Sequence, residues 1–342
     1  MTKSVCVLGA TGTVGREYLR LLSHHPFFKI KCVTGRTSVG KKLIEALSDG
    51  YEVQDLPKEV LELEVQPTDV KKVDADLVFS PLPNEIALKT EEEFAKAGFK
   101  VITDASPHRM DSDVPLIIPE VNPEQLSLIE SQKKRWSGFI VATPNCTAVG
   151  IAMTLKPLES FGVKSVVATT MQAVSGAGYP GVPSLDIIDN IIPFIQNEEE
   201  KVATETNKIL GRMSDPIKFS VTTTRVPVLN GHTASLYVEL EKPFEIEEIV
   251  RALENFRGRP QELNLPTAPK RPIIVHKEVT RPQPRLDRDE GSVPGMSVCV
   301  GRVRRGAHPN SVQYVEVSNN TVRGGAGGAV LTAELLVEEG FV

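Results

Sequence analysis

The chain has 342 residues, of which 40% are hydrophobic and 24% charged, and its formal net charge is -5. Charges of both signs are mixed along it, which excludes a basic face for nucleic acid and a polybasic segment for a membrane surface. No apolar stretch approaches the ~20 residues needed to cross a bilayer, and Met1 to Arg16 lacks the features of a signal peptide. We therefore expect a globular protein of two domains whose partners are small molecules and further copies of itself.

The first half of the chain alternates short apolar strands with helices. We expect strands at Ser4 to Leu8, Phe28 to Thr34, Ala75 to Ser80, Lys100 to Thr103 and Gly138 to Ala142, and helices at Val14 to Ser23, Glu85 to Ala97 and Pro123 to Lys134. Alternation of this kind predicts an α/β fold with a doubly wound, mostly parallel sheet, which is a Rossmann-like domain.

Beyond Gly150 the strands become longer and alternate apolar with polar residues. They are Ser165 to Gln172, Lys218 to Leu229, Thr233 to Glu241, Met296 to Val303 and Ser311 to Val317. This pattern predicts an α+β catalytic and dimerisation domain with a mainly antiparallel sheet. Within it, Arg281 to Gly291 is rich in proline and charge, so we expect an exposed loop or a subunit arm there.

The last helix, Ala326 to Glu339, follows a glycine-dense segment that lets backbone approach a ligand closely. We assign this helix to the cofactor domain. The expected domains are then residues 1–145 with 320–342, and residues 146–319.

A glycine turn with the spacing GxxGxxG follows the first strand and opens the first helix. It comprises Gly9, Ala10, Thr11, Gly12, Thr13, Val14 and Gly15. In this position the N–H groups of the helix bind a pyrophosphate, so the turn predicts a dinucleotide site; the alternative is a turn that only packs helix against strand.

The second strand ends in Thr34-Gly35-Arg36-Thr37-Ser38, without the carboxylate that holds the ribose of NAD. Arg36 and the hydroxyl of Ser38 suit a 2′-phosphate, which favours NADP over NAD. The alternative is that Arg36 is a solvated loop arginine.

The four cysteines, Cys6, Cys32, Cys146 and Cys299, are scattered, with no CxxC pair and no Cys/His cluster of metal-ligand spacing. We expect no metal site and a reducing, cytoplasmic compartment. Three of them lie in apolar strand-like runs and are interpreted as small buried hydrophobes.

Cys146 differs, because Thr143 to Gly150 places it where a strand gives way to a helix. Free backbone N–H groups of the helix start are expected to face the sulfur, favour the thiolate and stabilise an oxyanion. The Asn145 amide is expected to help orient the substrate.

A cysteine nucleophile needs a proton acceptor, and His232 is the best candidate. It lies between two strand runs beside Gly231, with Arg225 seven positions earlier. The alternative is a strand-end histidine with a satisfied hydrogen bond. His24 and His25 end a surface helix, and His276 and His308 lie in polar loops, so we expect no role for them.

Two further residues stand where ligands bind. Gln172 leads the glycine-rich segment that ends at Gly181, which either closes over a ligand or is only a turn. Arg109 follows the strand Lys100 to Thr103 at the carboxyl edge of the sheet and suits a phosphate or a carboxylate.

Together these segments resemble the aspartate-semialdehyde dehydrogenases of the archaeal and fungal type, over essentially the full length. The matching motifs are GATGTVG from Gly9, PNCTA around Cys146, QAVSGAGYPG from Gln172, EEEKVATETNKIL from Glu198, RVPVLNGH ending at His232, and NNTVRGGAGG before the last helix.

The resemblance implies NADP(H)-linked interconversion of aspartyl 4-phosphate and aspartate 4-semialdehyde, a step toward lysine, methionine and threonine. By it, Cys146 is the nucleophile, His232 the acid/base, and Gln172 orients the acyl group. The resemblance implies that Arg225 binds the substrate carboxylate and that Glu198 binds the substrate amino group. It implies that Arg109 and Lys201 bind the phosphate. Expected cofactor contacts, besides the glycine turn and Arg36, are Ser38, Ser80, Ser175, Gly176 and Asn320, the last of these at the nicotinamide amide.

Several alternatives stay open at this stage. A malonyl-CoA or succinyl-CoA reductase shares the fold, the cysteine and NADP, although Asn145 before Cys146 resembles the semialdehyde enzymes. N-acetylglutamyl-phosphate reductase is weaker, and a catalytically silent NADP-binding regulatory protein conflicts with the joint presence of the motifs. The three glutamates Glu198 to Glu200 leave the register of that match open, and the oligomer is a homodimer or a homotetramer.

Overall fold

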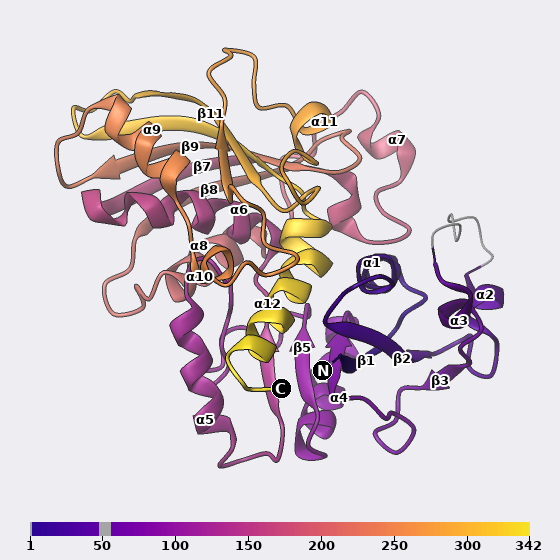
Figure 1. The fold of residues 1–342 in the computed structure, drawn as a ribbon. Coiled ribbons are helices and arrows are strands. Elements are labelled where there is room, and N and C mark those ends of the chain that lie inside the picture. Colours follow the sequence, from indigo (N-terminus) through magenta and orange to yellow (C-terminus); the bar gives the residue numbers. More distant parts are fainter. Residues whose placement is uncertain (1, 48–55) are drawn as a thin grey trace. The chain divides into compact units, whose positions relative to one another are not determined.

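The computed structural model describes residues 2–47 and 56–342 (Figure 1). The chain divides into two compact units. The first comprises Met1–Ile117, Glu124–Thr143 and Gly325–Val342, and the second comprises Ile118–Pro123 and Pro144–Gly324. The boundaries expected from the sequence differ from these units at Ile118–Pro123, at residues 144–145 and at residues 320–324.

Unit 1 contains a six-stranded sheet in the order β3-β2-β1-β4-β5-β6. Every neighbouring pair is parallel, which confirms the predicted doubly wound sheet. The strands are β1 (Lys3–Val7), β2 (Phe28–Gly35), β3 (Val65–Pro67), β4 (Leu77–Ser80), β5 (Lys100–Thr103) and β6 (Phe139–Ala142). The order reverses between β1 and β4, and such a switch point is where ligands bind in these sheets.

Helices connect these strands. They are α1 (Thr13–Leu22), α2 (Leu43–Ala46), α3 (Lys58–Leu61), α4 (Asn84–Lys96), α5 (Ile129–Gln132) and α12 (Gly327–Glu338). The helix expected at Pro123 to Lys134 is instead a 3-10 helix, Pro123–Leu128, followed by the single turn of α5.

The last helix, α12, packs against α1 and β5, as expected for an element of this unit. Its Glu334 is fully buried and lies 2.7 Å from Nε2 of His25. The expectation that His25 is a surface residue is therefore wrong, because its ring pairs with this buried carboxylate.

Unit 2 contains a mixed sheet in the order β10-β11-β12-β9-β7-β8. The three central pairs are antiparallel as predicted, and the two edge pairs are parallel. The strands are β7 (Val163–Gln172), β8 (Lys218–Arg225), β9 (His232–Leu240), β10 (Ile273–Val275), β11 (Val298–Arg305) and β12 (Ser311–Ser318). Strand β8 ends at Arg225 rather than at Leu229, since Pro227 has no N–H to continue the ladder.

The helices of unit 2 are α6 (Cys146–Leu155), α7 (Ser184–Ile187), α8 (Glu198–Ile209), α9 (Ile246–Asn255), α10 (Arg259–Glu262) and α11 (Pro284–Asp287), with short 3-10 helices at Lys156–Phe161 and Val174–Ala177 and a π-helical turn at Val322–Ala326. Helices α6 and α8 pack together beside the sheet (Figure 1). Residues Thr147 to Leu155 of α6 are all buried. A Cβ on Gly150 would lie 2.7 Å from Oε1 of Glu316, so glycine allows α6 to lie directly on β12.

The segment Arg281 to Gly291 is not the simple exposed loop expected. It contains α11, and Asp287 at the end of that helix is fully buried. The guanidinium of Arg281 pairs with the Asp287 carboxylate within the segment. Asp289 accepts a hydrogen bond from Asn319 Nδ2 at 2.8 Å, which holds the segment against the rest of unit 2.

Candidate active site

The thiol of Cys146 stands at the first residue of α6, immediately after the N-cap Asn145. Its sulfur lies 3.2 Å from Nε2 of His232, the first residue of β9. Residues 86 positions apart in the sequence thus form the cysteine and histidine pair that sequence analysis proposed.

The Asn145 side chain caps α6. Its Oδ1 accepts hydrogen bonds from the backbone N–H groups of Thr147 (2.9 Å) and Ala148 (3.0 Å). The expectation that these N–H groups are free to face the sulfur is therefore wrong, because the cap already uses them. What remains of the helix contribution is its positive N-terminal end, which still favours a thiolate.

The ring of His232 is buried and its orientation is fixed. Nδ1 accepts a hydrogen bond from the backbone N–H of Ala173 at 3.1 Å. Burial, and secondarily the positive charge of Arg225, lower the pKa of His232 from 6.5 to about 3. The imidazole is therefore neutral at pH 7, and since Nδ1 is an acceptor its proton sits on Nε2, facing the sulfur of Cys146.

A buried carboxylate, Glu198, lies beside this pair at the first residue of α8. It accepts from Asn145 Nδ2 (3.0 and 2.9 Å), from Thr147 Oγ1 (3.1 Å) and from Gln172 Nε2 (3.1 Å). A second carboxylate of α8, Glu205, accepts the backbone N–H of Asn145 at 2.6 Å. Helix α8 thus fixes the residue that precedes the nucleophile at two points.

The structure distinguishes the three consecutive glutamates. Glu198 is buried in the network just described, Glu199 accepts the backbone N–H of Thr223 at 3.0 Å, and Glu200 is exposed. Glu198 is therefore the member of the run that lies beside Asn145 and Gln172.

Arg225 ends β8 next to Gln172 at the end of β7, since the two residues are register partners. Its NH1 donates to the carbonyl oxygen of Ala173 at 2.8 Å. Burial lowers the pKa of Arg225, and the nearby Cys146 and Glu198 act in the opposite direction. A guanidinium, a carboxylate, an amide and a thiol thus meet at one end of the sheet.

Glycines make this convergence possible. A Cβ on Gly176 would lie 2.8 Å from Arg225 NH1 and 2.9 Å from His232 Cε1. A Cβ on Gly324 would lie 2.7 Å from Cβ of Cys146. Sequence reasoning interpreted the glycines near the last helix as room for a ligand, whereas Gly324 makes room for the nucleophile itself.

Asn320 joins two loops of the site. Its Nδ2 donates to Ser175 Oγ and its Oδ1 accepts the backbone N–H of Gly231, both at 2.8 Å. It therefore ties the turn that contains Gly176 to the residue before His232.

Comparison with known proteins gives the chain a family. A family model described as the semialdehyde dehydrogenase dimerisation domain matches residues 155–323, and one described as the semialdehyde dehydrogenase NAD binding domain matches residues 4–129. The aspartate-semialdehyde dehydrogenase of Archaeoglobus fulgidus is 47% identical over the full length of both chains. The chain belongs to the semialdehyde dehydrogenase family.

One further relative is named for a different activity, and a solved structure shares the name of the first. The malonyl CoA reductase (NADP) of Metallosphaera sedula is 46% identical and covers 100% of this chain and 98% of its own. The crystal structure of aspartate-semialdehyde dehydrogenase with NADP from Candida albicans superposes with a TM-score of 0.91 at 35% identity, covering both chains completely. Among residues 2–47 and 56–342 of this semialdehyde dehydrogenase, no helix is long and apolar enough to cross a membrane.

In unit 1 of this semialdehyde dehydrogenase the predicted glycine turn lies between β1 and α1. Gly9 has φ +62°, and Gly12 is an N-cap without a side chain. A Cβ on Gly15 would lie 2.4 Å from the carbonyl oxygen of Gly9, so glycine allows the helix to start tightly against the turn. Thr13 and Val14 form the exposed first turn of α1, which contains no acidic residue.

The remaining residues predicted to bind cofactor or phosphate lie outside the cluster around Cys146. Arg36 is exposed directly after β2, and Ser38 follows it. Ser80 ends β4, where its hydroxyl donates to the buried Glu91 at 2.6 Å. Arg109 of unit 1 donates to the Asp104 carbonyl at 2.7 Å, and Lys201 lies in the first turn of α8 in unit 2.

Sequence reasoning missed Thr147, Ala173, Glu205 and Gly324. Ala173 acts through its backbone N–H, and Glu205 accepts the backbone N–H of Asn145. Gly324 acts through the absence of a side chain. All four lie within motifs that had been noted, but nothing in their residue types indicates the contact that each one makes.

Proposed function

We propose that this chain is an NADP-dependent aspartate-semialdehyde dehydrogenase. It interconverts L-aspartate 4-semialdehyde plus phosphate and L-aspartyl 4-phosphate through a thioester on Cys146. The observation that carries the proposal is the 3.2 Å contact between Cys146 Sγ and His232 Nε2 at the start of α6, with Gln172, Glu198 and Arg225 around it.

Cys146 is the nucleophile in this proposal. Its thiolate is favoured by the helix N-terminus, by the Nε2 proton of His232 and by the positive charge of Arg225. In the oxidative direction the sulfur forms a bond to the aldehyde carbon, and the carbonyl π electrons move to oxygen. The product of this addition is a thiohemiacetal on Cys146.

His232 stabilises the charge that develops on the substrate oxygen. An oxygen on a carbon bonded to Sγ lies within reach of Nε2, because that nitrogen is only 3.2 Å from the sulfur. The Nε2–H group donates a hydrogen bond to the oxyanion that forms on addition, in place of the helix N–H groups that Asn145 caps. The electrons on that oxygen re-form the carbonyl in the next step, so no second proton has to be placed on Nε2.

NADP fits unit 1 and, when bound, supplies the hydride acceptor that converts the thiohemiacetal into a thioester. The glycine turn and the first turn of α1 would hold the pyrophosphate, since Gly12 and Thr13 are exposed at the start of the helix. Arg36 and Ser38 would hold the 2′-phosphate.

The thioester is attacked by phosphate. An oxygen of phosphate bonds to the acyl carbon and the carbon-sulfur bond breaks, which returns the thiolate. Arg109 and Lys201 are the proposed phosphate ligands, Arg225 the ligand of the substrate carboxylate and Glu198 that of its amino group. Oε2 of Glu198 accepts one hydrogen bond among those described, from Asn145, which supports this last role.

Gln172 and Asn145 hold Glu198 in place and so act on the substrate through it. The loops around His232 contain Asn320, Ser175 and Gly176. We propose that these three residues contact the nicotinamide end of NADP. We further propose a cytoplasmic homodimer or homotetramer, in keeping with four free cysteines and the dimerisation domain of the family model.

A second candidate is an NADPH-dependent malonyl-CoA reductase, since a relative of that name is 46% identical over the whole chain. It would use the same cysteine, histidine and cofactor. A malonyl-CoA reductase would not need residues that bind a substrate amino group or inorganic phosphate.

The deciding experiment follows NADP reduction with aspartate semialdehyde and varied phosphate, beside NADPH oxidation with malonyl-CoA. We expect phosphate-dependent NADP reduction that is abolished by Cys146→Ala and retained by the control Cys32→Ala. Turnover with the CoA thioester alone would assign the chain to the reductase, and turnover that survives Cys146→Ala would refute the thioester mechanism.

A further inference from the structure

A second cluster of reactive side chains lies in unit 2 among β10, β11 and α11. His276 follows β10, Cys299 is the second residue of β11, and Glu290 follows α11. One ligand atom from each, Nε2, Sγ and a carboxylate oxygen, lies within 4.8 Å of the other two. The mechanism proposed above uses none of these residues.

The spacing of these atoms matches the ligand set of a tetrahedral ion. Nε2 of His276 is 3.0 Å from Oε2 of Glu290, and Sγ of Cys299 is 3.8 Å from the same oxygen. With the bond lengths of zinc, tetrahedral nitrogen and oxygen ligands lie about 3.3 Å apart, and sulfur and oxygen about 3.6 Å apart. Two of the three distances therefore lie within a few tenths of an ångström of those in a zinc site, and the third, from Nε2 to Sγ, is at most 4.8 Å.

His276 supplies a second, independent observation. Its side chain is 9% exposed, and among the described residues its buried Nε2 makes no hydrogen bond, although Glu290 lies close by. Buried imidazole nitrogens that make no hydrogen bond are rare in folded proteins. The Nε2 of His276 thus points into the cluster, where its neighbours are the carboxylates of Glu290 at 3.0 Å and Asp287 at 3.7 Å.

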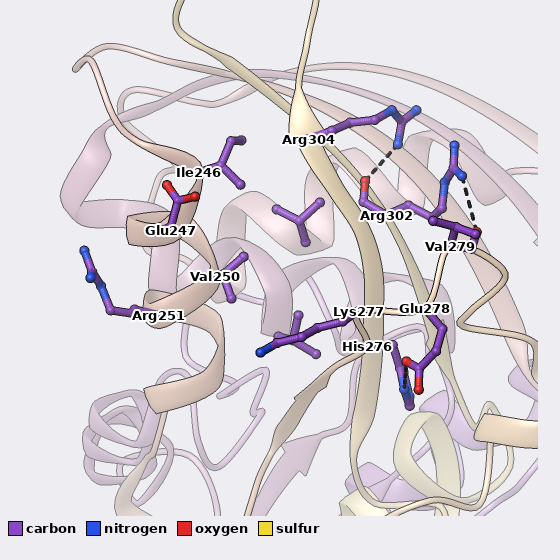
Figure 2. Close-up of a pocket in the computed structure, with 12 residues that line it drawn as sticks. Ile246, Glu247, Val250, Arg251, His276, Lys277, Glu278, Val279, Arg302 and Arg304 are labelled. Carbon is purple, nitrogen blue, oxygen red and sulfur yellow. Dashed lines mark hydrogen bonds and ion pairs between the residues drawn. The ribbon is translucent and has the colours of Figure 1, made fainter.

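Figure 2 shows the other side of this ring. The Glu278 carboxylate lies 3.8 Å from Nδ1 of His276, which is beyond hydrogen-bond distance. His276 also lines a pocket of ≈690 Å³ between α9 and the strands β10 and β11.

We propose that His276, Glu290 and Cys299 bind one zinc ion, with water in the fourth position. A thiolate, an imidazole and a carboxylate are the ligand types that zinc combines in proteins, whereas magnesium and calcium prefer oxygen alone. The site lies apart from Cys146 in sequence and in its elements, and we assign it a structural role that joins α11 to the edge of the sheet.

The charges around the cluster suit a divalent ion. Asp287 is already paired with Arg281, whose Nε donates to Oδ2 at 2.8 Å. Arg281 NH2 also donates to Oε2 of Glu290 at 3.4 Å, a longer contact that an ion bound to this oxygen would replace. Zinc binds the thiolate form of cysteine, so binding displaces the proton of the Cys299 thiol.

The test measures zinc binding to the full chain in a Cys146→Ala background, because Cys146 and His232 form another sulfur and nitrogen pair. Zinc is titrated in competition with a chromophoric chelator, and cobalt is added to detect the thiolate-to-metal absorption band. The test variants are Cys299→Ala and His276→Gln. Cys32→Ala, a buried cysteine of unit 1, and His308→Gln, an exposed histidine, are the matched controls.

We expect one zinc ion per chain. The affinity for zinc should fall more than tenfold in both test variants and in neither control. The cobalt band should disappear in Cys299→Ala. Affinity should rise with pH, since one thiol proton is released per ion. A folded Cys146→Ala protein that binds no zinc overturns the proposal without recourse to the other variants. Zinc binding that Cys299→Ala leaves unchanged, or cobalt binding without a thiolate band, overturns it equally.

Discussion

The backbone N–H of Ala173 donates to Nδ1 of His232 over 3.1 Å, and this contact decides which ring nitrogen carries the proton. With Nδ1 as an acceptor, the neutral ring presents an Nε2 proton to the Cys146 sulfur at 3.2 Å. In a doubly protonated ring, an N–H group at Nδ1 would face the N–H group of Ala173, and two donors cannot form a hydrogen bond. The histidine is therefore suited to donate a hydrogen bond from Nε2 to a developing oxyanion rather than to hold a second proton.

The buried neutral ring makes stability depend on pH. The pKa of His232 is about 3 in the folded chain, and a histidine in the unfolded chain titrates near 6.5. Since the unfolded state takes up the proton first, this stability is fully present above about pH 6.5 and is lost as pH falls toward 3. From pH 7 to pH 5 we expect the free energy of unfolding to fall by about 2 kcal/mol more in the native chain than in His232→Gln. Urea denaturation at both pH values measures this, and an equal pH dependence of the two proteins would contradict it.

Gly176 is expected to tolerate no side chain. In Gly176→Ala the added Cβ meets Arg225 NH1 and His232 Cε1 below 3 Å, so the ring of His232 or the guanidinium must move. We expect kcat to fall roughly 10- to 100-fold, the cost of misplacing a catalytic group by about 1 Å. Gly40→Ala is the control, since its Cβ meets nothing within 4 Å although its φ of +82° strains alanine. Comparable kcat values for the two variants would show that Gly176 has no special role.

Glu198 accepts hydrogen bonds from Asn145, Thr147 and Gln172, all of which are donors. In Glu198→Gln an amide group replaces an oxygen and faces one of these donors, so we expect a loss of about 1–3 kcal/mol in stability. If Glu198 also binds the substrate amino group, KM for aspartate semialdehyde rises as well. The exposed Glu200→Gln on the same helix is the control, and thermal unfolding with steady-state kinetics compares them. Indistinguishable variants would remove Glu198 from the site.

Arg36 tests the preference for NADP. In Arg36→Leu the positive charge after β2 is lost, so we expect KM for NADP to rise more than tenfold while KM for NAD hardly changes. The control is Arg20→Leu, whose guanidinium pairs with Glu17 on α1. A parallel rise of KM for both dinucleotides would mean that Arg36 does not read the 2′-phosphate.

Arg323 and Glu120 form a buried, bidentate ion pair within unit 2, at 2.8 and 2.6 Å. Removal of one partner leaves a buried charge, so Arg323→Met is expected to cost about 3–5 kcal/mol. The double variant Arg323→Met with Glu120→Gln should be more stable than Arg323→Met alone. Chemical denaturation of the four proteins in this cycle measures the coupling, and additive losses would contradict it.

Some elements of the fold were predictable because their signals are local. The apolar strands of unit 1, the glycine turn before α1 and the helix stop at Gly98 all follow from residues within a few positions of one another. The short edge strands β3 and β10 have three residues each, too few for a period to be recognised. The 3-10 helix at Pro123–Leu128 was missed because an apolar pattern does not distinguish it from an α-helix.

The sequence by itself determined the chemistry of the candidate site: a cysteine at a strand-to-helix junction, a histidine beside a glycine, and a glycine turn before the first helix. Only the tertiary structure decided which atoms meet. It placed His232 against Cys146, used the first N–H groups of α6 for the Asn145 cap, selected Glu198 from three adjacent glutamates, and gathered His276, Glu290 and Cys299. Residue types limit what a side chain can do, but its partner is chosen by packing between segments that are distant in the chain, and no local pattern records that choice.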